Sequence, residues 1–195
     1  VLDDLELNLK YALNTHVHAD HITGSGKLKL ANKGCQSVLG KKGNEEAKAD
    51  MYVDEGELIK VGNTIELEPR HTPGHTQGCY SFVCSVAGDD TKLVFTGDTI
   101  LIRGCGRTDF QGGSSESLYN SVKTKLFTLP DNTKLFSAHD YKGHTMSTIG
   151  EEKVHNPRLT KSLDEFKDIM ENLNLAYPKK IDVSLPANKL CGLQD

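Results

Sequence analysis

Histidine and aspartate residues cluster in a short motif near the start of this 195-residue chain, Thr15-His16-Val17-His18-Ala19-Asp20-His21. It follows an apolar, strand-like run. Alternate residues of an extended backbone point to the same side, so His16 and His18 are expected to face the same way. The turn that follows can bring Asp20 and His21 round to the same cavity. Imidazole and carboxylate groups gathered in this way are typical of a metal site.

Three further motifs each place another potential ligand after a strand-like run. They are Thr72-Pro73-Gly74-His75-Thr76, Phe95-Thr96-Gly97-Asp98 and Ser137-Ala138-His139-Asp140. In the first of these, proline and glycine favour a tight turn that directs His75 back over the end of its strand. Four strand ends therefore each present histidine or aspartate, and loops on a rigid scaffold are where binding sites are commonly built.

Together the motifs supply seven potential metal ligands: His16, His18, Asp20, His21, His75, Asp98 and His139. Neutral imidazole and carboxylate groups suit iron, zinc or manganese. Any single one could instead be a hydrogen-bonded histidine or a turn-capping aspartate. The whole set favours a metal, because burying this many polar groups without a cation would be costly. The other histidines, His71, His144 and His155, lie outside the pattern and are expected at the surface or behind the ligands.

The segments between the motifs must form the scaffold. Strands are expected over residues 10–15, 36–39 and 134–138, a short helix over 24–33, and two hairpins, 57–69 around Gly62-Asn63 and 79–96 around Gly88-Asp89-Asp90. An amphipathic helix is expected over 115–127, and capping boxes at Thr148–Glu151 and Ser162–Glu165 predict two more helices. Pro178 and Pro186 bound a final segment that we expect to be extended. This order of elements predicts an α/β sandwich, with residues 1–195 forming one domain.

The composition argues against several other classes of protein. A net charge of −4 and a pI near 6.1 provide no basic field for nucleic acid. No apolar run approaches the roughly 18 residues that a membrane-spanning helix needs. An odd number of cysteines without a CxxC pair argues against a disulfide framework or a thiolate zinc site, so reduced and mostly buried thiols are expected. The cysteines are Cys35, Cys79, Cys84, Cys105 and Cys191.

The metal-binding motifs resemble those of the metallo-β-lactamase superfamily. HxHxDH at 16–21, PGH at 73–75, GD at 97–98 and AHD at 138–140 carry the resemblance. It implies an αββα sandwich with metals at one edge. It does not choose the reaction, because the superfamily includes hydrolases, nucleases and oxygenases. Only 15 residues precede His16, whereas members normally carry several strands there, so an N-terminally shortened fold that lacks the first strands is expected.

Longer strings resemble one branch, the persulfide dioxygenase (sulfur dioxygenase, or ethylmalonic encephalopathy protein) family. They are LIRGCGRTDFQ at 101–111, HDY at 139–141, NPRLT at 156–160, NLNL at 172–175, and PAN at 186–188 with Cys191-Gly192. The resemblance implies that glutathione persulfide and O2 are converted to sulfite and glutathione at one Fe(II) per chain. It also implies the mitochondrial matrix, although no targeting segment is visible, and it allows a homodimer. No nucleic-acid or membrane partner is expected.

By motif position, the resemblance implies that His16, His75 and Asp98 hold the iron. Two imidazoles and one carboxylate on one face leave coordination positions for the persulfide sulfur and for O2. The remaining candidates, His18, Asp20, His21 and His139, would then surround an unfilled second metal position. The number of ligands alone leaves the alternative open that these four bind a second metal.

Glutathione carries two carboxylates, which a guanidinium can bind through paired hydrogen bonds. Arg107 is the first candidate for this contact, the alternative being a salt bridge to Asp109. Tyr141 is expected to line the substrate pocket, the alternative being a core tyrosine. Asp140 and Cys191 are further pocket candidates, and Arg158 and Lys142 are weaker candidates for substrate binding.

Two other functions compete with the dioxygenase hypothesis. One is a dinuclear thioester hydrolase of the glyoxalase II kind, a hydroxyacylglutathione hydrolase, in which a metal-bound hydroxide attacks a glutathione thioester. That family usually carries a longer helical region after the last motif, whereas this chain ends soon after His139. The other is a non-catalytic metal-binding scaffold that folds poorly or acts only through partners.

Overall fold

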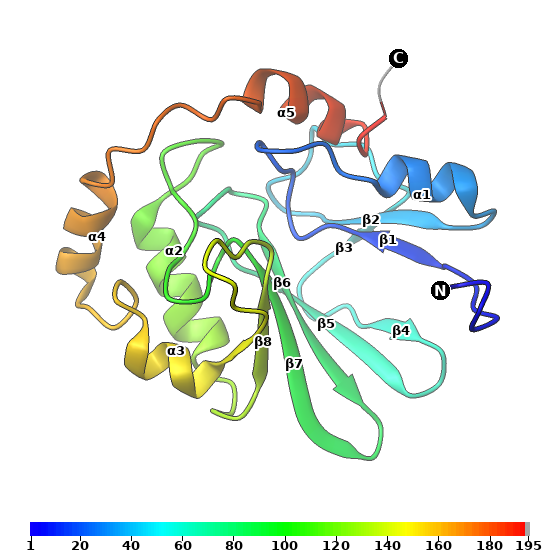
Figure 1. Ribbon diagram of the computed structural model, residues 1–195, viewed down its shortest axis with the longest axis horizontal. Coiled ribbons are helices and arrows are strands. Elements are labelled where there is room, and N and C mark those ends of the chain that lie inside the picture. Colours follow the sequence, from blue (N-terminus) through cyan, green and yellow to red (C-terminus); the bar gives the residue numbers. More distant parts are fainter. Residues whose placement is uncertain (194–195) are drawn as a thin grey trace.

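The computed structural model describes residues 1–193 (Figure 1). One sheet is parallel and has three strands, β1 (Tyr11–Leu13), β2 (Gln36–Gly40) and β3 (Met51–Val53). The other has six strands in the order β4 (Ile59–Val61), β5 (Ile65–His71), β6 (Tyr80–Val86), β7 (Asp89–Gly97), β8 (Lys134–Ser137) and β9 (Ser147–Thr148). Helix α1 (Ser25–Ala31) lies by the small sheet, and α2 (Ser115–Ser121), α3 (Ile149–His155) and α4 (Leu163–Glu171) lie beside the large one. The predicted α/β sandwich is therefore confirmed.

Both predicted hairpins form in the large sheet. β4 and β5 pair in antiparallel fashion across Gly62, which has a φ of 63° that suits glycine. β6 and β7 pair across Gly88, whose φ is 82°. β8 instead runs parallel to β7, because α2 crosses between them and returns the chain to the same end of the sheet.

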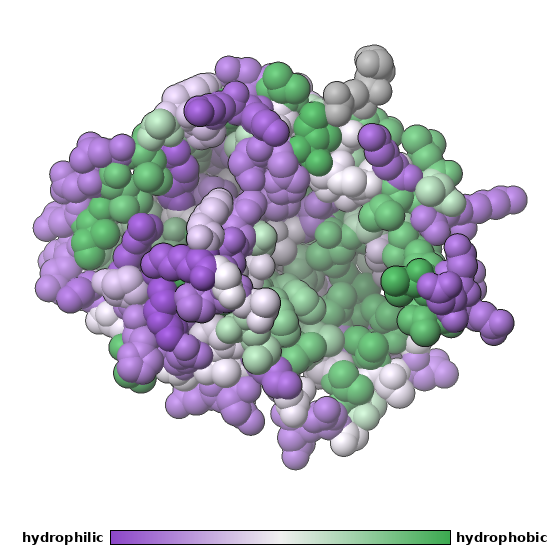
Figure 2. Space-filling view, in the orientation of Figure 1, coloured by the Kyte–Doolittle hydropathy of each residue, from purple (hydrophilic) through white to green (hydrophobic). Residues whose placement is uncertain are grey.

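Two apolar clusters hold these layers together. The larger lies between the large sheet and its helices and includes Val94, Leu118, Leu135 and Phe166, all fully buried. The second lies between the two sheets and is formed by Val38, Val53, Ile59, Tyr80 and Phe82. Figure 2 shows apolar side chains around the hollow between the sheets, whereas the outer helices carry mainly polar side chains with smaller apolar patches. None of the helices in residues 1–193 combines the length and apolar character required to cross a bilayer.

The predicted helix over 115–127 is present, but it begins as an α-helix and continues as a π-helix. α2 is followed by a π-helical turn, Val122–Leu126, and the Phe127 amide donates to the Val122 carbonyl at 2.8 Å. The Ser114 hydroxyl caps the start of α2 by accepting from the Ser117 amide. The wider turn still leaves the predicted apolar face against the core.

The two predicted capping boxes differ. At α4, the Ser162 hydroxyl accepts from the Glu165 amide while the Glu165 carboxylate accepts from the Ser162 amide, as predicted. At α3, the Thr148 hydroxyl accepts from the Glu151 amide at 3.1 Å, but the Glu151 carboxylate pairs with Arg103. The second capping box is therefore half formed, because a distant arginine binds its glutamate.

The prediction of an extended segment between Pro178 and Pro186 is wrong over most of its length. Helix α5 spans Ile181–Lys189 and contains Pro186. A proline inside a helix removes one hydrogen bond and strains the preceding turn. Buried residues on one face, Ile181, Ser184, Ala187 and Asn188, supply tertiary contacts that offset this loss. The short strands β3 and β9 were not predicted, because two or three residues are too few to show an alternation of apolar and polar side chains.

Asp50 joins the start of β3 to β2 and provides a test of acid stability. Its carboxylate accepts from the amide and hydroxyl of Ser37 at 2.7 and 2.8 Å and pairs with Lys29 at 2.5 Å. The hydrogen bond from Lys29, followed by that from the Ser37 amide, lowers the pKa of Asp50 from 3.8 to about 2. The unfolded chain therefore takes up this proton at a higher pH than the folded protein does.

We therefore expect Asp50 to stabilise the fold above its unfolded pKa of 3.8 and to lose that contribution as the pH falls toward about 2. Asp50→Asn should lower the urea midpoint at neutral pH and flatten its decline over this acidic window. Asp3→Asn, at an exposed position, is the control and should leave the pH dependence of the midpoint unchanged. Parallel curves for Asp50→Asn and the unaltered chain would contradict the expectation.

Candidate metal centre

The four predicted motifs meet at one site in the tertiary structure. Potential ligand atoms of His16, His75 and Asp98 all lie within 4.8 Å of one another. A second group forms beside the first under the same 4.8 Å limit and consists of His18, Asp20, His21 and His139. The rings of His16 and His18 are 4.1 Å apart at their centroids, so the two groups adjoin. All seven predicted ligands are thus brought together from strand ends far apart in the sequence.

The surrounding structure orients the two imidazoles of the first group. The Nδ1–H of His75 donates to the Arg107 carbonyl at 2.7 Å, which leaves Nε2 facing Asp98 Oδ2 at 3.4 Å. The Nδ1 of His16 shares a hydrogen bond of 3.0 Å with the Thr15 hydroxyl. A hydrogen bond on one ring nitrogen selects the other for a metal, so both Nε2 atoms are prepared as ligands.

Several buried polar atoms at this site have no hydrogen-bond partner in the described part of the chain. They include His16 Nε2, His18 Nδ1 and Asp98 Oδ1. A buried polar atom without a partner costs free energy, and a cation held by the first group would satisfy His16 Nε2 and the Asp98 carboxylate. Imidazole nitrogens with a carboxylate oxygen are a donor set for a first-row transition metal, so the residues present fit such an ion.

Burial also favours the neutral forms of the His16 and His18 imidazoles. It lowers the pKa of His16 well below 6.5, with repulsion from His18 as the next cause. Burial, followed by repulsion from His21, lowers the pKa of His18 to about 4. Both rings are therefore neutral at physiological pH, which is the form that binds metals. Burial raises the pKa of Asp98, and a divalent cation would reverse this effect by favouring the carboxylate.

Two glycines allow the ligand-bearing loops to approach closely. A Cβ on Gly97, where φ is 54°, would lie 2.5 Å from the Thr15 hydroxyl. A Cβ on Gly106 would lie 2.9 Å from the His75 ring, and the Gly106 amide donates to the Asp98 carbonyl at 2.7 Å. A side chain at either position would collide with a neighbouring loop, so the GD and GCGR strings need glycine there.

A cavity of about 520 Å³ opens over both ligand groups. One wall is the loop from Leu101 to Arg107, and the others come from residues 139–142 and from Arg158, Leu175 and Pro178. The predicted pocket residue Asp140 lines this cavity. Cys191 is not among the described residues that line it, and its sulfur lies 2.6 Å from the Lys48 carbonyl. The other four cysteines are buried free thiols, as predicted.

The structure distinguishes the two arginines of this cavity. Arg107 forms paired hydrogen bonds of 2.7 Å with the Asp109 carboxylate and donates to the Ala176 carbonyl at 2.8 Å. The salt bridge considered as its alternative role is therefore present. Arg158 donates to the Cys105 carbonyl at 3.3 Å and has no acidic partner within 4.0 Å among residues 1–193. The guanidinium of Arg158, the weaker candidate from the sequence, is therefore more available to a substrate than that of Arg107.

Tyr141 lies at the cavity mouth and is not a core residue. Its side chain is 82% exposed, and its ring stacks on His139 with centroids 5.9 Å apart and planes 9° apart. Asp20 Oδ2 lies 3.3 Å from His139 Nε2 and 3.1 Å from His21 Nδ1. The second ligand group is the more exposed of the two, and it borders the cavity.

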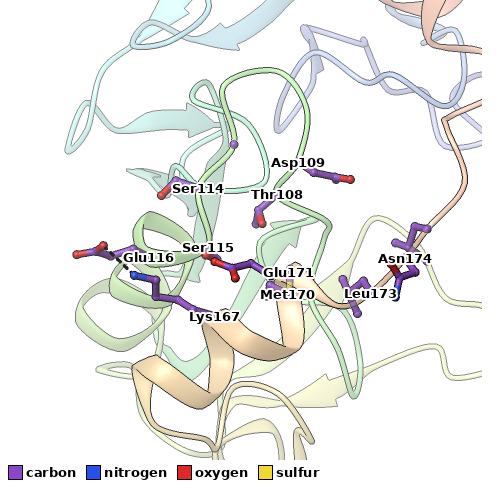
Figure 3. Close-up of a pocket in the computed structure, with 12 residues that line it drawn as sticks. Thr108, Asp109, Ser114, Ser115, Glu116, Lys167, Met170, Glu171, Leu173 and Asn174 are labelled. Atoms are coloured by element: carbon purple, nitrogen blue, oxygen red, sulfur yellow. Dashed lines mark ion pairs between the residues drawn. The ribbon is translucent and has the colours of Figure 1, made fainter.

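A separate cavity of about 560 Å³ lies between the N-terminal start of α2 and helix α4 (Figure 3). Glu116 and Lys167 form an ion pair of 3.8 Å at its edge. Leu175 lines this cavity and the one over the metal ligands, so the segment after α4 separates the two. None of the seven predicted ligands lines it.

Comparisons with known proteins agree with this geometry. Residues 2–139 match the family described as the metallo-beta-lactamase superfamily. The chain is 51% identical over 194 residues to "Persulfide dioxygenase ETHE1, mitochondrial" of Mus musculus and of Homo sapiens, an alignment that covers 100% of this chain and 74% of each relative. The crystal structure of ETHE1 from Myxococcus xanthus matches with a TM-score of 0.89 and 46% identity over 98% of this chain and 81% of that one.

Proteins named hydroxyacylglutathione hydrolases are also similar, but less so. A hydroxyacylglutathione hydrolase of Pelagibacter ubique is 38% identical over 144 residues, which cover 72% of this chain and 55% of the relative. The greater identity and the fuller coverage favour the dioxygenase branch. The chain belongs to the persulfide dioxygenase family of the metallo-β-lactamase superfamily.

Proposed function

We propose that this protein is a glutathione persulfide dioxygenase that holds one Fe(II) between His16, His75 and Asp98. The observation that carries the proposal is the convergence of these three side chains, with buried and unpartnered ligand atoms, in a chain of this family. In the overall reaction, one persulfide, one O2 and one water give glutathione, sulfite and two protons. The outer sulfur loses four electrons, and O2 gains them.

The ferrous ion, when bound, supplies the redox chemistry that joins the sulfur with O2. The protein residues supply position and charge. Hydrogen bonds to the Thr15 hydroxyl and to the Arg107 carbonyl hold the rings of His16 and His75 with their Nε2 atoms inward. Asp20 and His139, which lie 3.3 Å apart at the cavity, can hold water and accept protons released by the reaction.

For substrate recognition, we propose that Arg158 binds a carboxylate of glutathione at the wall of the 520 Å³ cavity. A charge-assisted contact of this kind contributes about 1.5–3 kcal/mol. Arg158→Ala is therefore expected to raise KM for glutathione persulfide roughly 10- to 100-fold with a smaller change in kcat. Steady-state O2 uptake measures both constants, and Arg158→Lys should recover part of the loss.

Arg107→Ala provides the comparison, because the Arg107 guanidinium already binds Asp109 and the Ala176 carbonyl. Its main expected effect is a lower melting temperature. If Arg107→Ala raised KM while Arg158→Ala did not, the sequence-based choice of Arg107 would be right and Arg158 would have no substrate contact.

The experiment that tests the proposed function is anaerobic purification, metal counting and addition of glutathione persulfide with O2 monitored. About one iron per chain and stoichiometric O2 uptake are expected. Two metals per chain, no O2 uptake and hydrolysis of S-lactoylglutathione would instead support the glyoxalase II-like alternative, which the second ligand group favours. The mitochondrial matrix is the proposed compartment, since the names of the mammalian relatives state that they are mitochondrial. The homodimer stays a prediction, which size-exclusion chromatography with light scattering would test.

A further inference from the structure

One side chain near the C-terminus, Asn188 in α5, binds the loop that carries four of the seven candidate ligands. Asn188 is only 6% exposed. Its Nδ2 donates to the His18 carbonyl at 2.8 Å and to the His21 carbonyl at 2.7 Å. Its Oδ1 accepts from the Thr23 amide at 2.8 Å. Both Asn188 amide hydrogens and its oxygen are thus used on residues 18–23, more than 160 positions away in the sequence.

The ligand loop has little other support for its backbone. Residues 16–23 lie between β1 and α1 and belong to no helix or strand. In the described part of the chain, no main-chain hydrogen bond joins these residues to another main-chain group. The Val17 carbonyl accepts instead from the side chain of Gln111 at 2.9 Å. Side chains from elsewhere therefore specify the path of this loop.

Asn188 is itself held firmly by the packing of α5. Leu185 packs against the cluster of Val17, Leu39 and Ala47. The Lys189 carbonyl accepts from the Lys48 amide at 2.7 Å, and the Cys191 carbonyl accepts from the Gly26 amide at 2.8 Å. Contacts on both sides of Asn188 therefore keep its amide group in place, so that it can impose a geometry on the loop.

We propose that Asn188 is a positioning residue for the metal centre. By fixing the carbonyls of His18 and His21, it sets the backbone path that turns the side chains of the HxHxDH motif toward the site. This inference rests on the proposed metal site. The three hydrogen bonds of Asn188 also add to the tertiary contacts that stabilise a helix containing Pro186.

The test uses Co(II) alone as a probe on the full chain, with the affinity measured by chelator competition and the geometry by the visible absorption band. Asn188→Asp keeps an oxygen for the Thr23 amide but places oxygen against the two carbonyls, and Asn188→Ala removes all three contacts. Both variants should weaken Co(II) binding about 10- to 100-fold, the range found for groups that orient metal ligands. They should also change the absorption band, while KM for glutathione persulfide stays near its original value.

Asn44 offers a matched control. It is 5% exposed, and its Nδ2 donates to two carbonyls, those of Gly40 and Gly78, at 2.9 and 2.8 Å. Asn44→Asp therefore suffers the same chemical change at the same burial, but outside the ligand loop. It should lose a similar amount of thermal stability and keep the Co(II) affinity and absorption band of the unaltered chain.

The outcomes separate this inference from the proposed function. If the unaltered chain does not bind Co(II), the metal site itself fails. If it binds Co(II) and the Asn188 variants bind it equally well with the same absorption band, Asn188 has only a structural role and the inference is overturned. If the variants do not fold, a second measurement on the unaltered chain tests the inference: the rate of hydrogen–deuterium exchange at the Thr23 amide, which donates to Asn188. Binding of Zn(II) should slow this exchange, and an unchanged rate would overturn the inference.

Discussion

Replacing Asp98 by asparagine is expected to remove nearly all bound iron and to lower dioxygenase activity roughly a thousandfold or more, which corresponds to about 4 kcal/mol. The reason lies in the charge and the burial of this side chain. Asp98 is the only anion among the three converging ligands, and its Oδ1 is buried without a hydrogen-bond partner. An amide oxygen of the same shape cannot neutralise the cation. Metal analysis per chain and O2 uptake measure the two losses.

Without a metal, Asp98→Asn should not destabilise the protein. Burial raises the pKa of Asp98, which shows that the site without a cation disfavours the carboxylate. Metal-free Asp98→Asn should therefore melt at or above the temperature of the metal-free unaltered chain, and it should gain less from added Fe(II). A general loss of folding would instead lower the melting temperature in both conditions.

Asp140→Asn is the control for this prediction. Asp140 also lines the cavity, but its carboxylate accepts from the amides of Lys142 and His144 and belongs to neither ligand group. Iron content should stay near that of the unaltered chain. Full iron occupancy in Asp98→Asn would remove the basis of the proposed centre.

Replacing Glu152 by alanine is expected to destabilise the fold by about 3–5 kcal/mol, as when one partner of a buried ion pair is removed. Glu152 is completely buried in α3. Its carboxylate accepts from the Arg103 amide at 3.0 Å and from the Arg103 guanidinium at 2.6 Å. It also accepts from Ser147 and Asn156 at 2.7 and 2.8 Å. Four donors would lose their acceptor at once.

The loss of Glu152 should also reach the metal centre through the loop after Asp98. Arg103 has a φ of 59°, a conformation that a non-glycine residue keeps only when its surroundings hold it. Asn156, whose amide binds Glu152, also donates to the Gly104 carbonyl at 3.0 Å. Gly106 and Arg107, farther along this loop, bind Asp98 and His75 through their backbones. Weaker iron binding should therefore accompany the loss of stability.

The neighbouring Glu151 gives an internal control, because it binds the same arginine from an exposed position. Exposed ion pairs contribute roughly 0–1 kcal/mol, so Glu151→Gln should change stability little. Urea denaturation of the metal-free proteins compares the two variants. Equal losses for Glu151→Gln and Glu152→Ala would mean that burial does not determine the strength of this network.

The sequence by itself determined the ligand-bearing motifs, both hairpins and the capping box at Ser162, as well as the resemblance that placed the chain in its family. These features depend on residues within about ten positions of one another, where turn chemistry and side-chain alternation act directly. The motif HxHxDH therefore predicted a metal site from local sequence alone, and Gly62-Asn63 predicted the hairpin that β4 and β5 form.

Only the tertiary structure decided which distant groups meet. It joined Arg107 to the Ala176 carbonyl, left Arg158 without an acidic partner among residues 1–193, and bound Glu151 to Arg103. It also formed α5 through Pro186, against the local preference of proline. In each case, the deciding free energy comes from burial and hydrogen bonds between residues far apart in the chain, and no local pattern records those contacts.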